Sequence, residues 1–225
     1  IVNDRGGNYL VDLGDGNDFL LAGGGADTYA GGNGVDALSY YHATAGVLVD
    51  LLSNAVAGSW AVDDVLSGFE RVYGSKTGAD TLRGTNGDNI IRGYGGNDLV
   101  HDRAGNDVVD LGDGNDTVYA GGGADTLAGG AGTDEVSYFY STAGVSVDLY
   151  YNTLSGGWAV DDVISGFERV TGSDTGNDTL LGTLGSDLLK GSGGNDVLHG
   201  RDGSDLLDGG IGADTMAGAA GADSF

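Results

Sequence analysis

The chain has 225 residues, of which 47 are glycine and none is proline or cysteine. Nine basic residues against 34 acidic ones give a formal net charge of -25, which excludes a nucleic-acid partner because phosphate binding requires clustered Lys and Arg. No disulfide can form, no apolar run approaches the ~18 residues of a membrane span, and no signal peptide opens the chain.

A nine-residue unit organises most of the chain. Residues 1–12 fit it loosely as a first turn, and the register is then kept in three blocks at 13–39, 75–137 and 173–225, the last one clipped. The fourth residue is Gly in all 16 units and the sixth is Asp in 15, with Asn89 as the exception. A fixed period of this kind indicates a repeat architecture.

Two units make one coil of 18 residues with a short strand on each side. Coils stacked at ~4.8 Å would form two parallel sheets, so the sequence predicts an all-β fold, a right-handed parallel β-roll or β-solenoid. Residues 1–225 are expected to form one elongated array, because no Pro-rich or charged linker divides them. The residues at position eight are expected to point into the core: Leu20, Leu38, Val100, Val118, Val136, Leu198 and Leu207.

Two interruptions, at 40–74 and 138–172, depart from the repeat. They resemble each other after a shift of 98 residues, and the apolar alternation at 46–52 and 144–150 indicates strands. We expect each interruption to continue the winding for about two turns without the loop chemistry of the repeats. The alternative is a bulge or a small hairpin off the side.

The aspartates at position six are candidate metal ligands. Carboxylates that repeat at the spacing of the coils repel one another, and a hard divalent cation with flexible oxygen coordination would remove the repulsion. Calcium fits better than magnesium or zinc, since the chain has no cysteine and only three histidines. Each ion is expected between residue i and residue i+18, which gives about ten sites. The candidate ligands are Asp18, Asp27, Asp36, Asp80, Asn89, Asp98, Asp107, Asp116, Asp125, Asp134, Asp178, Asp187, Asp196, Asp205, Asp214 and Asp223.

Those sites carry two further expectations. The pairs that form them are Asp18–Asp36, Asp80–Asp98, Asn89–Asp107, Asp98–Asp116, Asp107–Asp125, Asp116–Asp134, Asp178–Asp196, Asp187–Asp205, Asp196–Asp214 and Asp205–Asp223. The calcium site that Asn89 forms with Asp107 should be weaker than the others, because Asn in place of Asp removes a negative charge but keeps one side-chain oxygen. The competing interpretation is that these aspartates only form turns, which would explain Asp near Gly but not Asp at one phase of the repeat.

The units, such as GGNGVDALS and AGGGADTLA, resemble the RTX or hemolysin-type calcium-binding repeat family. The resemblance implies a calcium-dependent β-roll that is exported by type I secretion machinery and folds outside the cell, so the localisation would be extracellular. The chain begins at Ile1 and ends inside a nonapeptide, so we expect it to be a segment of a larger secreted protein with a structural or secretion-assisting role.

Other groups of residues favour a structural role over chemistry. His101 and His199 are expected to be surface or turn residues, and the acids Asp63, Asp64 and Glu70, with their counterparts 98 residues later, are expected to be structural or to hold an extra cation. We therefore expect no enzyme activity. The alternative function is an adhesin module that binds polysaccharide or a cell surface through aromatic residues of the interruptions, chiefly Trp60 and Trp158.

Overall fold

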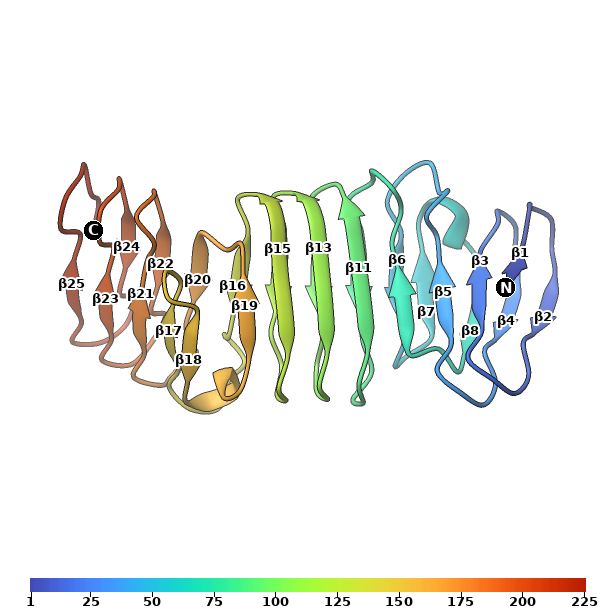
Figure 1. The fold of residues 1–225 in the computed structure, drawn as a ribbon, viewed down its shortest axis with the longest axis horizontal. Coiled ribbons are helices and arrows are strands. Elements are labelled where there is room, and N and C mark those ends of the chain that lie inside the picture. Colours follow the sequence, from blue (N-terminus) through green and yellow to red (C-terminus); the bar gives the residue numbers. More distant parts are fainter.

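The computed structural model describes all of residues 1–225 as an elongated stack of short strands (Figure 1). Most strands occupy the last three residues of a nonapeptide, and consecutive repeat strands lie in opposite sheets. Within a sheet the strands are parallel and their partners are 18 residues apart, as for Leu82, Val100 and Val118. The predicted all-β parallel roll with 18-residue coils is therefore confirmed.

Four sheets make up the two faces of the roll. One face begins with β1 (Val2–Asn3), β3 (Phe19–Leu21), β5 (Ala37–Ser39), β9 (Arg71–Tyr73), β11 (Ile90–Gly95), β13 (Val108–Gly114), β15 (Thr126–Gly132) and β19 (Val163–Ser165). It is continued by β17 (Ser146–Asp148), β18 (Thr153–Ser155), β21 (Thr179–Leu181), β23 (Val197–His199) and β25 (Thr215–Ala217).

The opposite face starts with a three-stranded sheet of β2 (Leu10–Asp12), β4 (Thr28–Ala30) and β8 (Val65–Ser67). It is continued by a nine-stranded sheet of β6 (Leu48–Asp50), β7 (Ala55–Ala57), β10 (Thr81–Arg83), β12 (Leu99–His101), β14 (Thr117–Tyr119), β16 (Glu135–Ser137), β20 (Arg169–Thr171), β22 (Leu188–Lys190) and β24 (Leu206–Asp208).

A single hydrophobic core runs along the stack between the two faces. The middle residue of each strand points inward because side chains alternate along a strand, and this residue is position eight of the unit. All the side chains that we expected to point inward are buried: Leu20, Leu38, Val100, Val118, Val136, Leu198 and Leu207.

Each interruption combines the two expected arrangements. After β5 the chain moves ahead to β6, reverses in the antiparallel hairpin β6–β7, passes through the short helix η1 (Ser59–Ala61), and returns to β8 beside β4. Strands β8 and β9 then continue the winding. The second interruption repeats this path through β17, β18 and η2 (Gly157–Ala159). In Figure 1 the short helix of the first interruption lies at the upper side of the stack and that of the second lies at the lower side. No helix of the structure is long and apolar enough to cross a bilayer.

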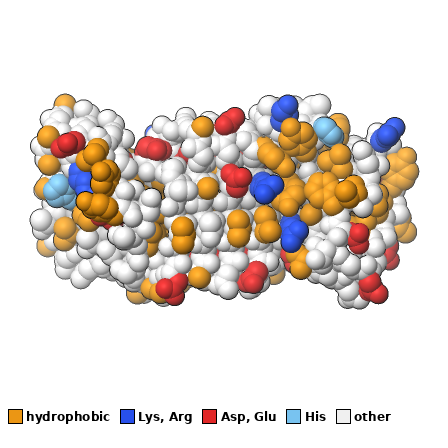
Figure 2. Space-filling model, viewed as in Figure 1, with side chains coloured by type: hydrophobic (Ala, Val, Ile, Leu, Met, Phe, Trp, Pro, Cys, Tyr) orange, Lys and Arg blue, Asp and Glu red, His pale blue; other side chains and the backbone are white.

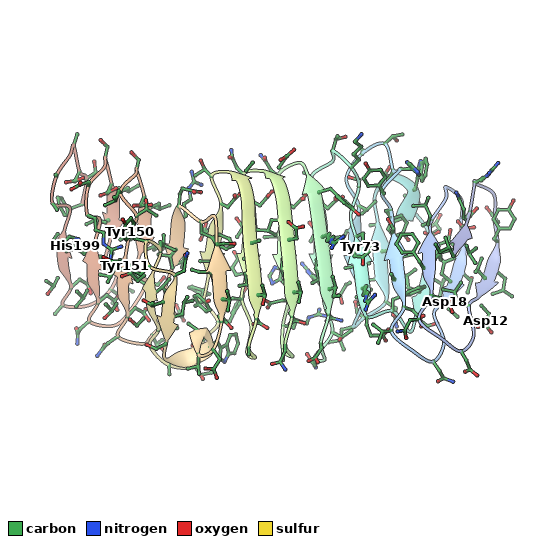
Figure 3. The ribbon with its side chains drawn as sticks, viewed as in Figure 1. Asp12, Asp18, Tyr73, Tyr150, Tyr151 and His199 are labelled. Atoms are coloured by element: carbon green, nitrogen blue, oxygen red, sulfur yellow. The ribbon has the colours of Figure 1, made fainter.

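Aromatic side chains gather on the outside beside the first interruption. The ring centroids of Tyr41 and Tyr94 are 4.9 Å apart, those of Tyr73 and Tyr94 are 6.5 Å apart, and the Arg92 guanidinium lies 5.4 Å from the centroid of Tyr73. Figure 2 shows hydrophobic side chains with Lys and Arg in the N-terminal half of this face, around the place where Figure 3 labels Tyr73. These rings pack on one another where the winding is interrupted.

Candidate metal centre

The position-six side chains form a ladder along the turns. Oδ1 of Asp98 accepts a hydrogen bond from the backbone N–H of Asp80 at 2.8 Å, and Oδ1 of Asp116 accepts one from Asp98 at 2.7 Å. All ten pairs expected from the sequence are joined in this way, at 2.7–3.1 Å. The structure therefore brings together the two members of each pair.

The second carboxylate oxygen, Oδ2, has no partner in most of the ladder. It is buried without a hydrogen bond in Asp36, Asp98, Asp107, Asp116, Asp125, Asp134, Asp196 and Asp205. A buried, ionised oxygen without a partner is costly, and folded proteins rarely leave one unpaired. A regular row of such atoms is what a row of cations would require.

The electrostatics of the ladder also indicate cations. Burial raises the pKa of Asp98 to about 7, against the hydrogen bond from the Asp80 backbone, and the charges of Asp80 and Asp116 raise it further. Burial likewise raises the pKa of Asp107 to about 7, with the charge of Asp125 adding to the rise. A positive ion beside these groups would favour their ionised form. Calcium accepts six to eight oxygens in flexible geometry, so a set of carboxylate and carbonyl oxygens fits it.

Glycine at position one leaves the space beside Oδ2 open. A Cβ atom on Gly93 would lie 2.1 Å from Oδ2 of Asp98 and 2.4 Å from the carbonyl oxygen of Leu111. On Gly200 it would lie 2.1 Å from Oδ2 of Asp205. The Gly thus makes a cradle that any larger residue in this backbone conformation would fill.

Four predicted ligands differ from the rest, because hydroxyl and amide groups of their own unit bind the side-chain oxygen. Oδ2 of Asp80 accepts hydrogen bonds from the backbone N–H of Ser75 at 2.8 Å and from its hydroxyl at 3.2 Å. Ser173 and Thr183 act in the same way on Asp178 and Asp187. In Asn89 the amide oxygen accepts from Thr85, while Nδ2 donates to the carbonyl oxygen of Glu70 at 2.9 Å. These residues lie near the starts of blocks two and three, where protein donors already satisfy the oxygen.

The ladder continues through both interruptions on residues that we did not include among the ligands. The backbone N–H of Asp27 donates to Oδ1 of Asp64 at 2.9 Å, and that of Asp36 donates to Oε2 of Glu70 at 2.9 Å. Asp162 and Glu168 make the equivalent bonds in the second interruption. The duplicated acids are the sequence signal for these positions. They depart from the expectation that the interruptions lack the loop chemistry of the repeats, because they accept the same backbone hydrogen bonds as the position-six aspartates.

The ends of the array are more open. Asp18, Asp214 and Asp223 are only partly buried, in contrast to the ligands of the central block.

Asp27 is buried, and its carboxylate accepts hydrogen bonds from the backbone of Tyr9 and the hydroxyl of Tyr29.

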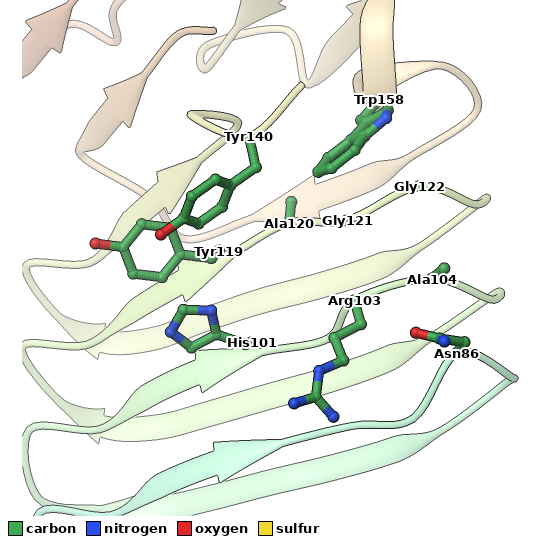
Figure 4. Close-up of a pocket in the computed structure, with 10 residues that line it drawn as sticks. All are labelled: Asn86, His101, Arg103, Ala104, Tyr119, Ala120, Gly121, Gly122, Tyr140 and Trp158. Carbon is green, nitrogen blue, oxygen red and sulfur yellow. The ribbon is translucent and has the colours of Figure 1, made fainter. Parts of the chain in front are cut away.

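Trp60 and Trp158 occupy equivalent places in the short helices and pack against the core. The Trp158 indole also covers Gly122 and, with Tyr140, Tyr119 and His101, lines a pocket of about 410 Å³ (Figure 4). The ring centroids of His101 and Tyr119 are 4.5 Å apart in a stacked arrangement. Both Trp side chains thus have a packing role.

Comparison with known proteins gives one clear match. A family model described as an RTX calcium-binding nonapeptide repeat in four copies matches residues 10–38, 76–109, 101–136, 173–207 and 191–225, which together cover more than half of the chain. No curated protein matches the chain.

Proposed function

The chain belongs to the family of RTX calcium-binding nonapeptide repeats, and from this premise we propose that it is a structural, secretion-assisting segment of a larger protein exported by type I secretion. In this proposal the segment folds outside the cell when about ten calcium ions bind between successive turns. The observation that carries the proposal is the row of buried Oδ2 atoms that have no partner.

The free energy of folding depends on the ions. The chain has 47 glycines, and glycine loses more conformational freedom on folding than any other residue. Without cations, the folded state would also hold a row of buried carboxylates one coil apart. Burial raises the pKa of Asp98 and of Asp116, and the charges of neighbouring ladder carboxylates raise both further. The free energy of calcium binding then supplies the free energy of folding. A chain that is unfolded at low intracellular calcium can be exported through a narrow channel and can fold at its destination.

A structural role is better supported than catalysis. Two of the duplicated acids of the interruptions, Asp64 and Asp162, accept hydrogen bonds in the ladder and from the hydroxyls of Tyr40 and Tyr138, which is a structural role. Polysaccharide binding through Trp60 and Trp158 stays a prediction with weaker support, because both indoles pack against the core.

The test is the number and identity of bound ions. The purified chain is dialysed against calcium or magnesium, desalted, and the bound metal is counted by atomic emission. We expect about ten calcium ions and few magnesium ions. Asp116→Asn should reduce the calcium count and Asp113→Asn should not, because Asp116 is in the ladder and Asp113 is exposed. A count near zero, or equal counts for the two metals, would contradict the proposal.

A further inference from the structure

Asp102 is a buried acid outside the position-six series. It stands at position one of its unit, where most units have Gly, and its side chain is fully buried. Oδ1 of Asp102 accepts a hydrogen bond from the backbone N–H of Gly121 at 2.6 Å. Its Oδ2 atom has no partner in the structure.

Asp102 lies against one pair of the ladder. One carboxylate oxygen each from Asp102, Asp107 and Asp125 lie within 4.8 Å of one another, and all three residues have a buried, unpartnered Oδ2. Two oxygens that bind the same calcium at ~2.4 Å can be no more than ~4.8 Å apart. The three side chains are thus close enough to share one ion.

The equivalent place 98 residues earlier in the chain, which we call the first copy, is filled by a tyrosine hydroxyl. Residues 98 positions earlier are Asp4 for Asp102, Tyr9 for Asp107, Asp27 for Asp125 and Tyr29 for Leu127. The hydroxyl oxygen of Tyr29 lies 2.6 Å from Oδ2 of Asp4 and 2.8 Å from Oδ2 of Asp27.

The backbone around the two places is the same. The N–H of Tyr9 donates to Asp27 at 2.7 Å, just as the N–H of Asp107 donates to Asp125 at 2.8 Å. The next link is also repeated, from Asp27 to Asp64 and from Asp125 to Asp162, at 2.9 Å in each case. The two copies therefore differ in what lies between the carboxylates, and hardly in the frame that holds them.

We propose that Asp102, Asp107 and Asp125 form a three-carboxylate cation site, and that the Tyr29 hydroxyl takes the place of the ion at the equivalent position of the first copy. This rests on the proposed function, since it adds a third anionic ligand to one of the ladder sites. Calcium affinity rises with the number of charged ligands and with the rigidity of the site. The Asp102 site is therefore the last in the array to release its ion, and the Tyr29 position holds none.

The first test compares two equivalent acids. Asp102→Asn and Asp4→Asn keep the shape of the side chain and remove one charge. Native mass spectrometry at decreasing free calcium reports how many ions each chain retains. We expect Asp102→Asn to lose the most tightly held ion, with at least about a tenfold weaker affinity for it. Asp4→Asn should retain its ions as the unmodified chain does. Equal effects of the two substitutions, or no effect of either, would overturn the proposal.

The second test exchanges residues between the two equivalent places. Leu127→Tyr should place a hydroxyl between Asp102 and Asp125 and remove one ion, while Tyr9→Asp combined with Tyr29→Leu should create a three-carboxylate site and add one. Unchanged ion counts in both variants would contradict the proposal, even if the chain binds calcium elsewhere. Absence of calcium from every variant and from the unmodified chain would instead contradict the proposed function.

Discussion

The guanidinium of Arg103 binds the carboxylate of Asp50 through two hydrogen bonds of 2.9 and 2.8 Å, and donates a third to the carbonyl oxygen of Gly84. Burial alone would raise the pKa of Asp50, but these hydrogen bonds from Arg103 lower it to about 2. Arg201 and Asp148 repeat the arrangement 98 residues later. The pair thus ties the last residue of β6, and so the hairpin, to the coils that follow.

Removing this tie should destabilise the roll. Arg103→Ala removes both short hydrogen bonds to the largely buried carboxylate of Asp50 and leaves it a single ion pair, the longer one with Arg83 at 3.9 Å. The Arg103–Asp50 pair is intermediate between exposed and fully buried ion pairs. We expect a loss of about 2 kcal/mol in the free energy of unfolding of the calcium-loaded chain, measured by denaturant titration. Arg5 is the equivalent residue before the first hairpin, is exposed, and forms no ion pair, so Arg5→Ala is the matched control. Equal losses in the two variants would exclude a specific role for the pair.

At Gly93 the cradle beside Oδ2 leaves no room for a side chain in the present backbone conformation. Gly93→Ala would bring a methyl group to 2.1 Å from Oδ2 of Asp98, so either the turn or the carboxylate must move. We expect a loss of about 1–3 kcal/mol and weaker calcium binding. Gly87 is at position four, and a Cβ there would be 3.8 Å from the nearest other atom, the Thr85 hydroxyl. Gly87→Ala should therefore be tolerated; if both variants unfold and bind calcium alike, the cradle is not the reason for Gly93.

Protons should compete with calcium. Without metal, burial raises the pKa of Asp98 to about 7 from its ordinary 3.8. The metal-free folded state therefore binds more protons than the unfolded chain between these values. The contribution of Asp98 to the stability of the metal-free folded state is fully present below pH 3.8 and is lost as the pH rises through about 7. Calcium binding has the opposite dependence, because the ion requires the ionised carboxylate.

The measurement is the calcium midpoint of folding at several pH values. Because the metal-free chain is unfolded in this account and its carboxylates then titrate near their ordinary pKa of 3.8, lowering the pH from 8 to 6 should leave the midpoint nearly unchanged, and the midpoint should rise only as the pH approaches about 4. A midpoint that rises by on the order of tenfold per ligand between pH 8 and 6 would show instead that the metal-free chain is already folded, with carboxylates that titrate near 7.

Much of the roll could be predicted from the sequence because one period determines both the strands and the turns. The register of Leu82 with Val100 and of Asp80 with Asp98 follows from two nonapeptides per coil. That spacing also identified the residue pairs that the structure brings together.

The interruptions could not be predicted to the same depth. The step from Asp27 to Asp64 is 37 residues and the step from Asp36 to Glu70 is 34, so no count of nonapeptides identifies these partners. The alternation of residues 46–52 indicated a strand, but a strand pattern does not say which strand it pairs with. Asp102 was missed for a related reason, since its role depends on contacts across coils rather than on its place in the unit.

The most direct test of the account is a calcium titration followed by far-UV circular dichroism, starting from the chelated chain and repeated with magnesium. Binding that supplies the folding energy predicts a cooperative change from coil to β-structure with calcium alone. A chain that is already folded in chelator would contradict the account, because the buried carboxylates would then be stable without the ions.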